Sequence, residues 1–553
     1  MPCLFNSYDP YFKQPFGALR AGQTVRLTLC IPEELGYVDP HLVLQKEGKY
    51  DVPVHYRMKF DGQTPQQNHF SVELPLNDPG LYFYYFDLYT DFRRIYRGPD
   101  NCGVVSWQEG EKWQITVYDA GFQTPECIKG KVFYQIFPDR FCEGIENKPM
   151  PFPDRLYQAD KHAEPFWQPN ETGGHLNEDY FGGDLKGIQM KLPYLRKMGV
   201  DYLYLNPIFE AHSNHRYNTA DYLNVDPLLG TNEDFEALCT AAKKYGIGIV
   251  LDGVFSHTGS DSRYFNREGR YGEGGAYRDP NSPYRCWYDF GPQYKDGYRS
   301  WWGFETLPEV DEETPSYVEF ITGPGGVIDT WLRRGAAGFR LDVADELPDE
   351  FIEKVRAAVK RVSPEKFLLG EVWEDATTKF GFNKRRTYLL GKGLDSVMNY
   401  PFKNAVLDFV KGKPAEQAMT EILTICEHYP APAMDTALNF LSTHDTERAL
   451  TVIADEPANG RGRAWQSGRC VTGDAYEEGL LRLRMAYAII YTLPGVPCLY
   501  YGDEIAMQGY RDPFNRAFFR WDAHEQRLRP VLAQLAQLRH TCEAFRTGQL
   551  RVL

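Results

Sequence analysis

The first part of the chain consists of short segments in which apolar and polar residues alternate. Within residues 24–117, five such segments are separated by Pro, Gly, Asn and Asp, and they read TVRLTLCI, VPVHYRMKF, HFSVELPL, LYFYYFDLY and KWQITVYD. Period-two alternation with turn residues at this spacing is typical of a β-sandwich. Because the pattern stops in the aperiodic segment 119–131, we predict an N-terminal β-sandwich domain over residues 1–125.

The second part, residues 126–535, shows continuous apolar runs that alternate with longer amphipathic stretches. Eight runs have the length of buried strands, at 132–137, 201–208, 246–255, 338–343, 367–373, 394–400, 438–443 and 496–503. The stretches between them have helical periodicity, and several end in Gly, as helices often do. Eight such units predict an α/β fold of the TIM (β/α)8 barrel type. A doubly wound open sheet is the alternative, but no Gly-rich phosphate loop follows any of the runs.

An insertion at 258–326 follows the third predicted strand of the barrel. It is rich in Gly, Pro, Tyr and Trp. Connections of this length are usually functional, so we expect the insertion to contribute to a site.

Charged residues end several of the predicted barrel strands, where TIM barrels carry their chemistry. Arg340 and Asp342 lie two residues apart and therefore share one strand face, and Arg340 is expected to keep Asp342 ionised. Glu371 ends the next strand, shielded by Trp373. Retaining glycoside cleavage needs two such carboxyl groups about 5–5.5 Å apart. We predict Asp342 as nucleophile and Glu371 as general acid and base, with Asp445 stabilising the transition state.

Two histidines also follow predicted strands, His257 after the third and His444 after the seventh. Both are candidates for hydrogen bonds to sugar hydroxyls. A single strand-end Asp or His is more often a cap or a structural group, so the prediction depends on several such residues meeting in one barrel.

Composition narrows the classes of function. The 553 residues carry 61 Lys and Arg against 76 Asp and Glu, a net charge of −15 without blocks of like charge, which argues against a nucleic-acid binder. Aromatic residues make up 15% and suit the faces of sugars. The 11 cysteines form no zinc-type cluster, so we expect free thiols, no metal and a cytoplasmic protein. No apolar run approaches the roughly 20 residues that span a membrane, and we expect no membrane partner.

Four segments resemble, in order and in strand placement, the signature regions of the α-amylase family, glycoside hydrolase family 13. They are DGVFSH at 252–257, GFRLDVADE at 338–346, GEVW at 370–373 and FLSTHDTE at 440–447. The segments YQIFPDRF, HRYNTADY, LPEVD and YYGDE extend the resemblance over roughly 130–525. It implies the barrel, the insertion as domain B, and retaining cleavage of α-linked glucans.

Carried over residue by residue, the resemblance assigns the same three carboxylates, Asp342, Glu371 and Asp445. It implies substrate-binding roles for Arg340, His257 and His444, and it adds Tyr217 as a ring stacked under the sugar. The remaining candidates for substrate binding are His215, Asp345, Glu346, Trp373 and Glu374.

Within the family, the N-terminal β domain and the VADE segment look most like cyclomaltodextrinases, neopullulanases and maltogenic amylases. That group commonly has Asn where Asp345 stands and often His where Glu374 stands. Both exchanges add negative charge on the acceptor side of the site. The resemblance also implies that a homodimer, where one forms, uses the N-terminal domain, which we expect to bind carbohydrate or to mediate dimerisation.

Two further departures concern calcium and the end of the chain. The group often binds calcium in a loop after the first strand, but the corresponding segment 142–150 has few suitable oxygens, although Gly183 and Asp184 remain. We therefore expect no cofactor and no essential calcium. Relatives usually end in a β-sandwich, so residues 536–553 are expected to be a remnant or the start of a C-terminal β domain.

The predicted activity is hydrolysis of α-1,4-glucosidic bonds in maltooligosaccharides, cyclodextrins or pullulan through a covalent glycosyl-enzyme. The partner is therefore an α-glucan oligosaccharide or polysaccharide. An α-1,6-acting debranching enzyme or a glucanotransferase of the same family is the alternative. A non-catalytic carbohydrate-binding protein is less favoured, because none of the three carboxylates is missing.

Overall fold

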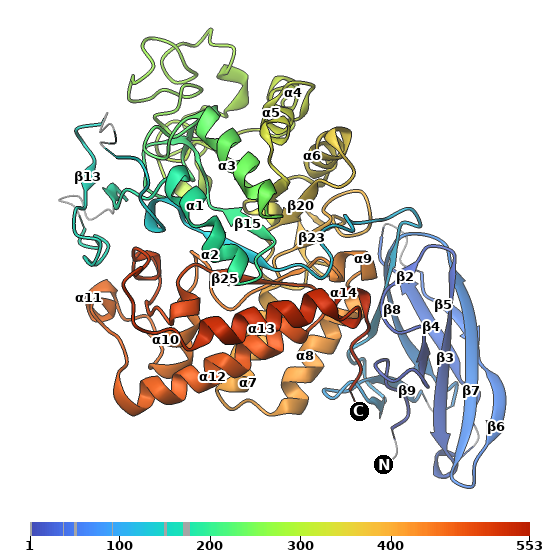
Figure 1. Ribbon diagram of the computed structural model, residues 1–553. Coiled ribbons are helices and arrows are strands. Elements are labelled where there is room, and N and C mark those ends of the chain that lie inside the picture. The colour runs from blue at the N-terminus through green and yellow to red at the C-terminus, as the bar shows by residue number, and fades with distance from the viewer. Residues whose placement is uncertain are drawn as a thin grey trace.

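The computed structural model describes residues 3–36, 38–48, 52–90, 92–146, 148, 152–169 and 177–552. A strand-rich N-terminal part lies beside a larger barrel that helices surround (Figure 1). Separate hydrophobic cores fill the two parts, the first around Leu27, Phe86 and Trp113 and the second around the barrel strands.

Two antiparallel sheets form the N-terminal sandwich within the described residues. The first has the order β1 (Lys13–Gln14), β3 (Gln23–Pro32), β7 (Gln67–Leu76) and β6 (Lys59–Gln63). The second has the order β10 (Gly103–Ser106), β9 (Arg94–Arg97), β8 (Gly80–Asp87), β11 (Trp113–Tyr118) and β2 (Leu19–Arg20), with β4 (His41–Lys46) beside β8 and β5 (Val54–Arg57) beside β4. The pair β2–β11 is parallel, and η1 (Glu33–Leu35) follows β3. Burial alternates along most of β8, while the second half of β3 is buried continuously, and both strands contribute to the core between the sheets.

One predicted strand is divided in the structure. The segment VPVHYRMKF supplies both β5 and β6, which belong to different sheets and are separated by the buried Met58. The chain crosses from one sheet to the other at Met58, a change that uninterrupted alternation in the sequence does not reveal.

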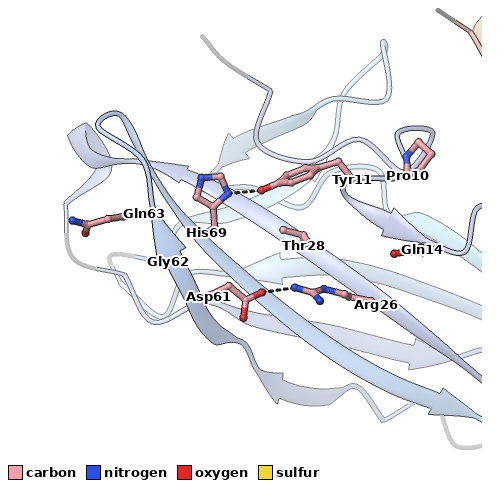
Figure 2. A pocket seen from close by; sticks show the side chains of 9 residues that line it. All are labelled: Pro10, Tyr11, Gln14, Arg26, Thr28, Asp61, Gly62, Gln63 and His69. Atoms are coloured by element: carbon pink, nitrogen blue, oxygen red, sulfur yellow. Dashed lines mark hydrogen bonds and ion pairs between the residues drawn. The ribbon is translucent and has the colours of Figure 1, made fainter.

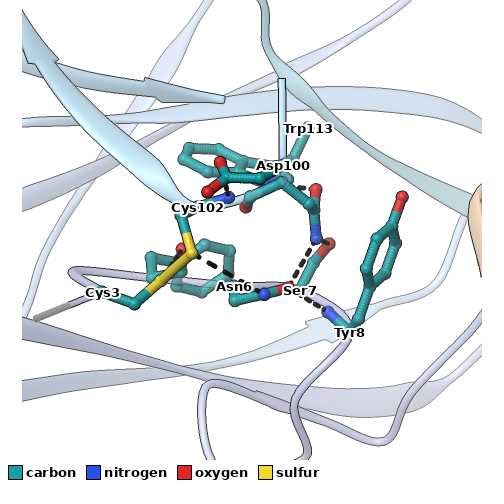
Figure 3. The surroundings of a disulfide bond; sticks show 9 residues. Cys3, Asn6, Ser7, Tyr8, Asp100, Cys102 and Trp113 are labelled. Atoms are coloured by element: carbon teal, nitrogen blue, oxygen red, sulfur yellow. Dashed lines mark hydrogen bonds between the residues drawn. A yellow bond between two sulfur atoms is a disulfide. The ribbon is translucent and has the colours of Figure 1, made fainter. Parts of the chain in front are cut away.

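The extreme N-terminal segment is tied to the sandwich by a disulfide bond between Cys3 and Cys102 (Figure 3). The prediction that all thiols are free is therefore wrong for this pair, while the other nine of the 11 cysteines, all within the described residues, are free. A sequence separation of 99 residues hid the pairing. Asn101, next to Cys102, donates hydrogen bonds to Asn6 and Ser7 and accepts one from the indole of Trp113, so the tail packs onto the core.

The same tail fastens the sandwich to the barrel. Buried Lys13 forms an ion pair of 2.6 Å with Glu427, which also accepts a hydrogen bond from Ser7. Farther along, Gln114 donates to Thr377 of the barrel. A packing that separated Lys13 from Glu427 would leave a buried charge without a partner, which costs stability. The ion pair therefore favours one arrangement of the sandwich on the barrel.

Eight parallel strands form the barrel in the part of the chain that the structure describes, and they match the eight predicted runs. In chain order they are β12 (Phe133–Ile136), β15 (Tyr202–Leu205), β18 (Gly248–Gly253), β19 (Gly338–Leu341), β20 (Phe367–Gly370), β23 (Ser396–Val397), β24 (Leu438–Asn439) and β25 (Val496–Tyr500). Each pairs with the next, β25 returns to β12, and a parallel bridge between Met398 and Leu438 joins β23 to β24. The barrel is thereby closed, and the polar residues that follow its strands converge at one end.

Helices cover the outside of this barrel (Figure 1). The α-helices are α1 (Leu185–Met190), α2 (Leu192–Lys197), α3 (Asn232–Lys244), α4 (Pro315–Thr322), α5 (Val327–Arg334), α6 (Asp349–Val362), α7 (Tyr400–Val410), α8 (Ala415–His428), α9 (Ala431–Met434), α10 (Ala449–Ala454), α11 (Arg463–Gln466), α12 (Gly473–Thr492), α13 (Leu528–Thr541) and α14 (Ala544–Thr547). Short 3-10 turns are η2 (Pro138–Arg140), η3 (Arg285–Trp287), η4 (Trp301–Gly303), η5 (Ala344–Glu346), η6 (Asp503–Ile505) and η7 (Phe514–Arg516). Small two-stranded pairs are β13 (Leu156–Tyr157) with β14 (Asp179–Tyr180), β16 (Phe209–Ala211) with β17 (Thr219–Val225), and β21 (Phe380–Gly381) with β22 (Lys384–Arg385).

The structure shows helix in the segment 536–552 where the sequence suggested a β domain or its remnant. Residues up to Thr541 continue α13, and α14 follows. Leu532 and Ala536 of α13 are buried against the barrel, which explains the helical pattern. Among the helices of the described residues, none is both long enough and apolar enough to cross a membrane.

Candidate active site

Arg340 stands at the centre of the charged groups in the barrel mouth. It extends from β19 and is fully buried. Its Nη1 donates hydrogen bonds to Oδ1 of Asp252 at 2.7 Å and to Oδ1 of Asp342 at 2.8 Å. Its Nη2 forms an ion pair of 2.8 Å with Oε2 of Glu371. One guanidinium therefore contacts carboxyl groups from the ends of three neighbouring strands, β18, β19 and β20, a geometry that the planar fork of Arg suits.

Asp342 lies where β19 ends, and the backbone turns sharply after it. Val343 has φ 38° and ψ 51°, a left-handed conformation that a β-branched residue rarely adopts. In this conformation the Val343 N–H donates to Oε2 of Glu371 at 2.9 Å. The strained turn thus joins the two carboxyl groups that the sequence predicted as a pair.

Glu371 is 3% exposed and has a donor on each oxygen. The indole N–H of Trp373 donates to Oε1 at 3.0 Å, opposite the contacts of Arg340 and Val343 to Oε2. Trp373 itself stacks on Tyr400 with ring centroids 4.2 Å apart. The carboxyl group is therefore held in one orientation, as the sequence prediction of shielding by Trp373 anticipated.

The electrostatics of Asp342 differ from the prediction. Burial raises the pKa of Asp342 well above its usual range, while Arg340 acts in the opposite direction. The sequence indicated an Arg paired with one Asp, but the structure shares that Arg among Asp342, Asp252 and Glu371. Three carboxyl groups therefore share one guanidinium, and a positive charge arriving beside them would favour their ionised forms.

Tyr217, His444 and Asp252 form a hydrogen-bonded group beside the carboxylates. Tyr217 Oη donates to Oδ2 of Asp252 at 2.8 Å and lies 2.5 Å from Nε2 of His444. The two rings are nearly parallel, with centroids 5.3 Å apart. Gln135 donates to Nδ1 of His444 at 2.9 Å, which leaves the ring proton on Nε2. Burial lowers the pKa of His444 well below its ordinary value, so the ring is neutral.

Asp445 follows His444 and faces the open side of the mouth. Its side chain is 31% exposed, 3.0 Å from Nε2 of His444 and 3.5 Å from Nη2 of Arg516. Withdrawal from water raises the pKa of Asp445 to about 7, and the charge of Glu371 adds to the shift. The structure therefore brings together all three carboxyl groups predicted from the sequence.

His257 and His215 contact the backbone of Tyr217. Nε2 of His257 is 3.1 Å from the Tyr217 carbonyl, and Nδ1 of His215 accepts from the Tyr217 N–H. Burial lowers the pKa of His257 to about 4 and that of His215 to about 3, so both are neutral near pH 7. These two histidines therefore fix the Tyr217 backbone, a contact that the sequence could not show.

The insertion at 258–326 reaches the site through η4. Trp301 donates to Oε2 of Glu346 at 2.6 Å, and the exposed Trp302 donates to Oε1 at 2.9 Å. The Trp301 ring also lies 5.4 Å from the ring of His257. The insertion thus contacts two of the residues that the sequence predicted for substrate binding, Glu346 and His257.

Asp345 and Glu374 share Lys379 as an ion-pair partner, a contact that the sequence pattern does not reveal. Nζ of Lys379 lies 2.8 Å from Oδ2 of Asp345 and 2.8 Å from Oε2 of Glu374. One ammonium between the two groups therefore offsets part of the added negative charge expected on the acceptor side. Because Asp345 lies three residues after Asp342 and Glu374 three after Glu371, Lys379 also joins the two loops that carry the central carboxylates.

Several site residues were missing from the sequence prediction. They are Gln135, Tyr204, Asn206, Asp252, Trp301, Lys379, Tyr400 and Arg516. Asp252 opens the DGVFSH segment and lies near the carboxyl end of the third predicted strand, so its position was the available signal. The others sit in apolar or loop segments without a pattern of their own.

Asp184 faces the segment where the family group often binds calcium, and other donors already occupy its carboxylate among the described residues. Asp184 is fully buried and already accepts backbone N–H groups from Gly187, Gly144 and Ile145. Lys148 places its ammonium 2.8 Å from Oδ2 of Asp184. Calcium takes six to eight oxygen ligands, so it would have to displace these donors from Asp184. Parts of the predicted loop 142–150 lie outside the described residues.

A separate cavity of about 520 Å³ opens on the four-stranded sheet of the sandwich (Figure 2). The ring of Tyr11 and the side chains of Arg26, Asp61 and His69 line it, and the Tyr11 hydroxyl meets His69 while Arg26 meets Asp61. None of the barrel carboxylates lines this cavity. It is a polar concavity with one exposed aromatic ring.

Comparison with known proteins matches residues 135–541 to the family model described as alpha amylase, catalytic domain. The chain is 34% identical to an amylopullulanase of Thermoanaerobacter thermohydrosulfuricus over 99% of its own length and 39% of that protein. It is also 34% identical to neopullulanase 2 of Thermoactinomyces vulgaris, over 78% of this chain and 66% of the relative. The chain thus spans about two fifths of the length of the amylopullulanase that it matches.

Solved structures agree with the fold. The type III pullulan hydrolase from Thermococcus kodakarensis aligns with a TM-score of 0.67 and 25% identity, over 99% of this chain and 89% of that one. The cyclic α-maltosyl-(1→6)-maltose hydrolase from Arthrobacter globiformis aligns with a TM-score of 0.64 and 30% identity, over 78% and 87%. The first alignment includes the N-terminal sandwich as well as the barrel.

Proposed function

The chain belongs to the α-amylase family, and from this premise we propose that it is a retaining hydrolase of α-1,4-glucosidic bonds. The substrates are maltooligosaccharides, cyclodextrins or pullulan. The observation that carries the proposal is Arg340, which contacts Asp342 and Glu371 at 2.8 Å each and so holds both carboxyl groups at one site.

In the first step, a carboxylate oxygen of Asp342 attacks the anomeric carbon while the glycosidic C–O bond breaks. Glu371 gives its proton to the departing oxygen, and a glycosyl ester of Asp342 remains. In the second step Glu371 removes a proton from water, and the resulting oxygen attacks the anomeric carbon. The ester bond breaks, Asp342 is released as a carboxylate, and Glu371 is protonated again.

The surrounding charges favour this reaction. Positive charge develops on the sugar in the oxocarbenium-like transition state. Asp445 lies open to the mouth and Asp252 lies behind Arg340, so the excess of carboxylates stabilises that charge more than it stabilises the neutral substrate. Tyr217 and the neutral His444 present a flat aromatic surface beside the reacting carbon.

The remaining predicted residues form the walls for sugar binding in this proposal. Trp373 is 43% exposed beside Glu371 and offers an aromatic face, while Asp345, Glu346 and Glu374 line the side toward the insertion and Lys379. Polar side chains beside an aromatic face are what binding of sugar rings requires.

Action on α-1,6 bonds is the second candidate, and the names of relatives favour keeping it. The matched proteins include an amylopullulanase and a hydrolase of a cyclic sugar with 1→6 links. A glucanotransferase would use the same carboxylates with a sugar in place of water. A non-catalytic role is disfavoured because all three carboxyl groups stand in one site.

A product profile tests the function. Purified protein is given pullulan, β-cyclodextrin, maltotriose and soluble starch in parallel, with Glu371→Gln as the blank, and products are separated by chromatography. Panose from pullulan together with opened cyclodextrin supports the proposed α-1,4 activity. Maltotriose from pullulan would instead establish α-1,6 cleavage, and products equal to those of the blank would contradict the enzyme assignment.

For the N-terminal sandwich we propose binding of carbohydrate or of a second copy of the chain. The cavity around Tyr11, with Arg26 and Asp61, has the mixed aromatic and polar lining that sugars need. Exposed apolar side chains such as Phe60 and Trp107 support dimerisation. Retardation in starch-containing gels tests carbohydrate binding, and light scattering on the purified chain tests dimerisation.

A cytoplasmic location also remains a proposal. Nine free cysteines are typical of a reducing compartment, whereas Cys3–Cys102 would be open there. Alkylation of the protein in native extracts, followed by mass spectrometry, shows whether Cys3 and Cys102 are reduced or paired. Free Cys3 and Cys102 support the cytoplasm, and a recovered disulfide contradicts it.

A further inference from the structure

A compact group of charges lies where the segment after β12 meets the segment before α1. Asp139 accepts the backbone N–H groups of Phe181 and Gly182, at 3.0 and 3.1 Å. The peptide carbonyls of the same two residues accept hydrogen bonds from other donors. Two lysine side chains provide them, so this stretch of backbone is held from both sides.

Lys148 is the more deeply placed of these lysines. Its side chain is 4% exposed, and Nζ donates to the Gly182 carbonyl at 2.6 Å while lying 2.8 Å from Oδ2 of Asp184. Asp184 is fully buried, so the two charges face each other away from water. A buried carboxylate without a cation would be strongly disfavoured.

Lys161 completes the arrangement nearer the surface. Its ammonium donates to the Phe181 carbonyl and pairs with Glu143 at 3.0 Å. Glu143 is 44% exposed, so this pair contributes less than the buried one. The Gly182 carbonyl and Oδ2 of Asp184 are thus already bound to the Lys148 ammonium, and Oδ1 of Asp184 accepts backbone N–H groups.

We propose that Lys148 is a built-in counter-cation that takes the place of a divalent metal ion at this junction. A single ammonium of Lys148 neutralises Asp184 and satisfies the Gly182 carbonyl, two tasks that a bound calcium would perform with carboxylate and carbonyl ligands. The segment after β12 is consequently fastened to the start of α1 without dependence on metal concentration. The stability of this junction therefore depends on side chains of the protein alone.

The proposal also says what removal of the ammonium does. In Lys148→Asp a second carboxylate faces Asp184, beside the free carbonyl of Gly182. The new carboxylate, Asp184 and the Gly182 carbonyl then face one another without a cation between them. The fold is therefore destabilised until a divalent cation binds there. The substitution is therefore expected to convert a metal-independent junction into one that responds to calcium.

Thermal unfolding of the full chain tests this, with each protein measured in 1 mM EDTA and in about 5 mM CaCl₂. The wild type is expected to show the same Tm in both. Lys148→Asp is expected to unfold roughly 5 °C or more lower in EDTA and to recover a large part of that loss in CaCl₂. Lys186→Asp, the same charge change on an exposed position of neighbouring α1, serves as the matched control and is expected to respond to neither.

Three results overturn the proposal. The first is calcium bound stoichiometrically to the purified wild type in elemental analysis, and the second is a wild-type Tm that falls in EDTA. The third is a Lys148→Asp protein that behaves like Lys186→Asp. Where Lys148→Asp does not fold, Lys148→Met decides, because loss of the ammonium alone must lower Tm, and an unchanged Tm contradicts the role of Lys148. Neither readout uses enzymatic activity, so failure here is distinct from failure of the proposed function.

Discussion

The backbone N–H of Val343 donates a hydrogen bond to Oε2 of Glu371 at 2.9 Å. Val343 directly follows Asp342, so the nucleophile and the proton donor of the proposed reaction are connected through one peptide group. The N–H can point at Glu371 because Val343 adopts φ 38°, which costs backbone energy for a β-branched residue. Strain at this turn is thus linked to the orientation of the acid.

Substitutions at Val343 test that strain. Val343→Gly and Val343→Ala both remove the branched side chain, but only Gly adopts a positive φ without cost. We expect Val343→Gly to be more stable than Val343→Ala by about 1 kcal/mol, the reverse of the usual order. Chemical denaturation of the two variants measures the difference. An Ala variant as stable as the Gly variant would show that the turn is unstrained.

Arg340→Lys tests the shared guanidinium. Lysine presents one ammonium and cannot contact Asp252, Asp342 and Glu371 together, so at least one buried carboxylate loses its partner. We expect the free energy of unfolding to fall by about 3 kcal/mol and kcat to fall by roughly 10²-fold or more. Arg334→Lys, on the exposed pair with Glu236, is the control and should change neither quantity.

Asp342→Asn tests the nucleophile itself. The amide keeps the size of the side chain but cannot attack the anomeric carbon, so we expect hydrolysis to fall below detection with Tm within a few degrees of the wild type. Turnover of an activated aryl maltoside by stopped assay is the measurement. Activity that persists in the folded variant would remove Asp342 from the mechanism.

Asp445→Asn tests the pKa of a carboxyl group at the mouth. The pKa of Asp445 is about 7 in the folded chain, above the ordinary 3.8, so the folded state holds its proton more tightly than the unfolded state. Wild-type stability from this group is present below pH 3.8 and is lost as the pH rises toward 7. Asn does not ionise, so the Tm of the variant should gain on the wild type between pH 4 and pH 8.

The measurement for Asp445 is a series of thermal scans across that pH range. A constant difference in Tm between wild type and Asp445→Asn would show that the carboxyl group is not perturbed. Hydrolysis by the variant is expected to be lost at every pH, because the charge facing the transition state is gone.

Lys379→Gln tests the acceptor side. Without the ammonium, Asp345 and Glu374 repel each other and the loops that carry them move apart. We expect KM for maltotriose and the ratio of transfer products to hydrolysis products to change by a few-fold while Tm changes little. Lys384→Gln, which removes the pairs with Asp349 and Glu350 instead, is the control. Equal product ratios in all three proteins would contradict the assignment.

Local patterns in the sequence were sufficient to predict the eight barrel strands and to select three carboxylates near their ends, whose catalytic roles remain predictions. A strand of a TIM barrel is buried along its length, so it reads as an apolar run, and its first polar residue marks the mouth. Asp342 and Glu371 directly follow β19 and β20 in this way, whereas Asp445 lies six residues beyond the end of β24. The alternation over residues 24–117 identified the sandwich for the same reason, since one face of each strand is buried.

Only the tertiary structure decided which distant residues meet. Lys148 and Asp184, Lys379 with Asp345, and Cys3 with Cys102 are separated by tens of residues and carry no local signal. The pKa of Asp445 and the sharing of Arg340 likewise depend on burial and on neighbours from other strands. Sequence periodicity reports what each segment must bury, whereas charge balance depends on distances that exist only after the segments have packed.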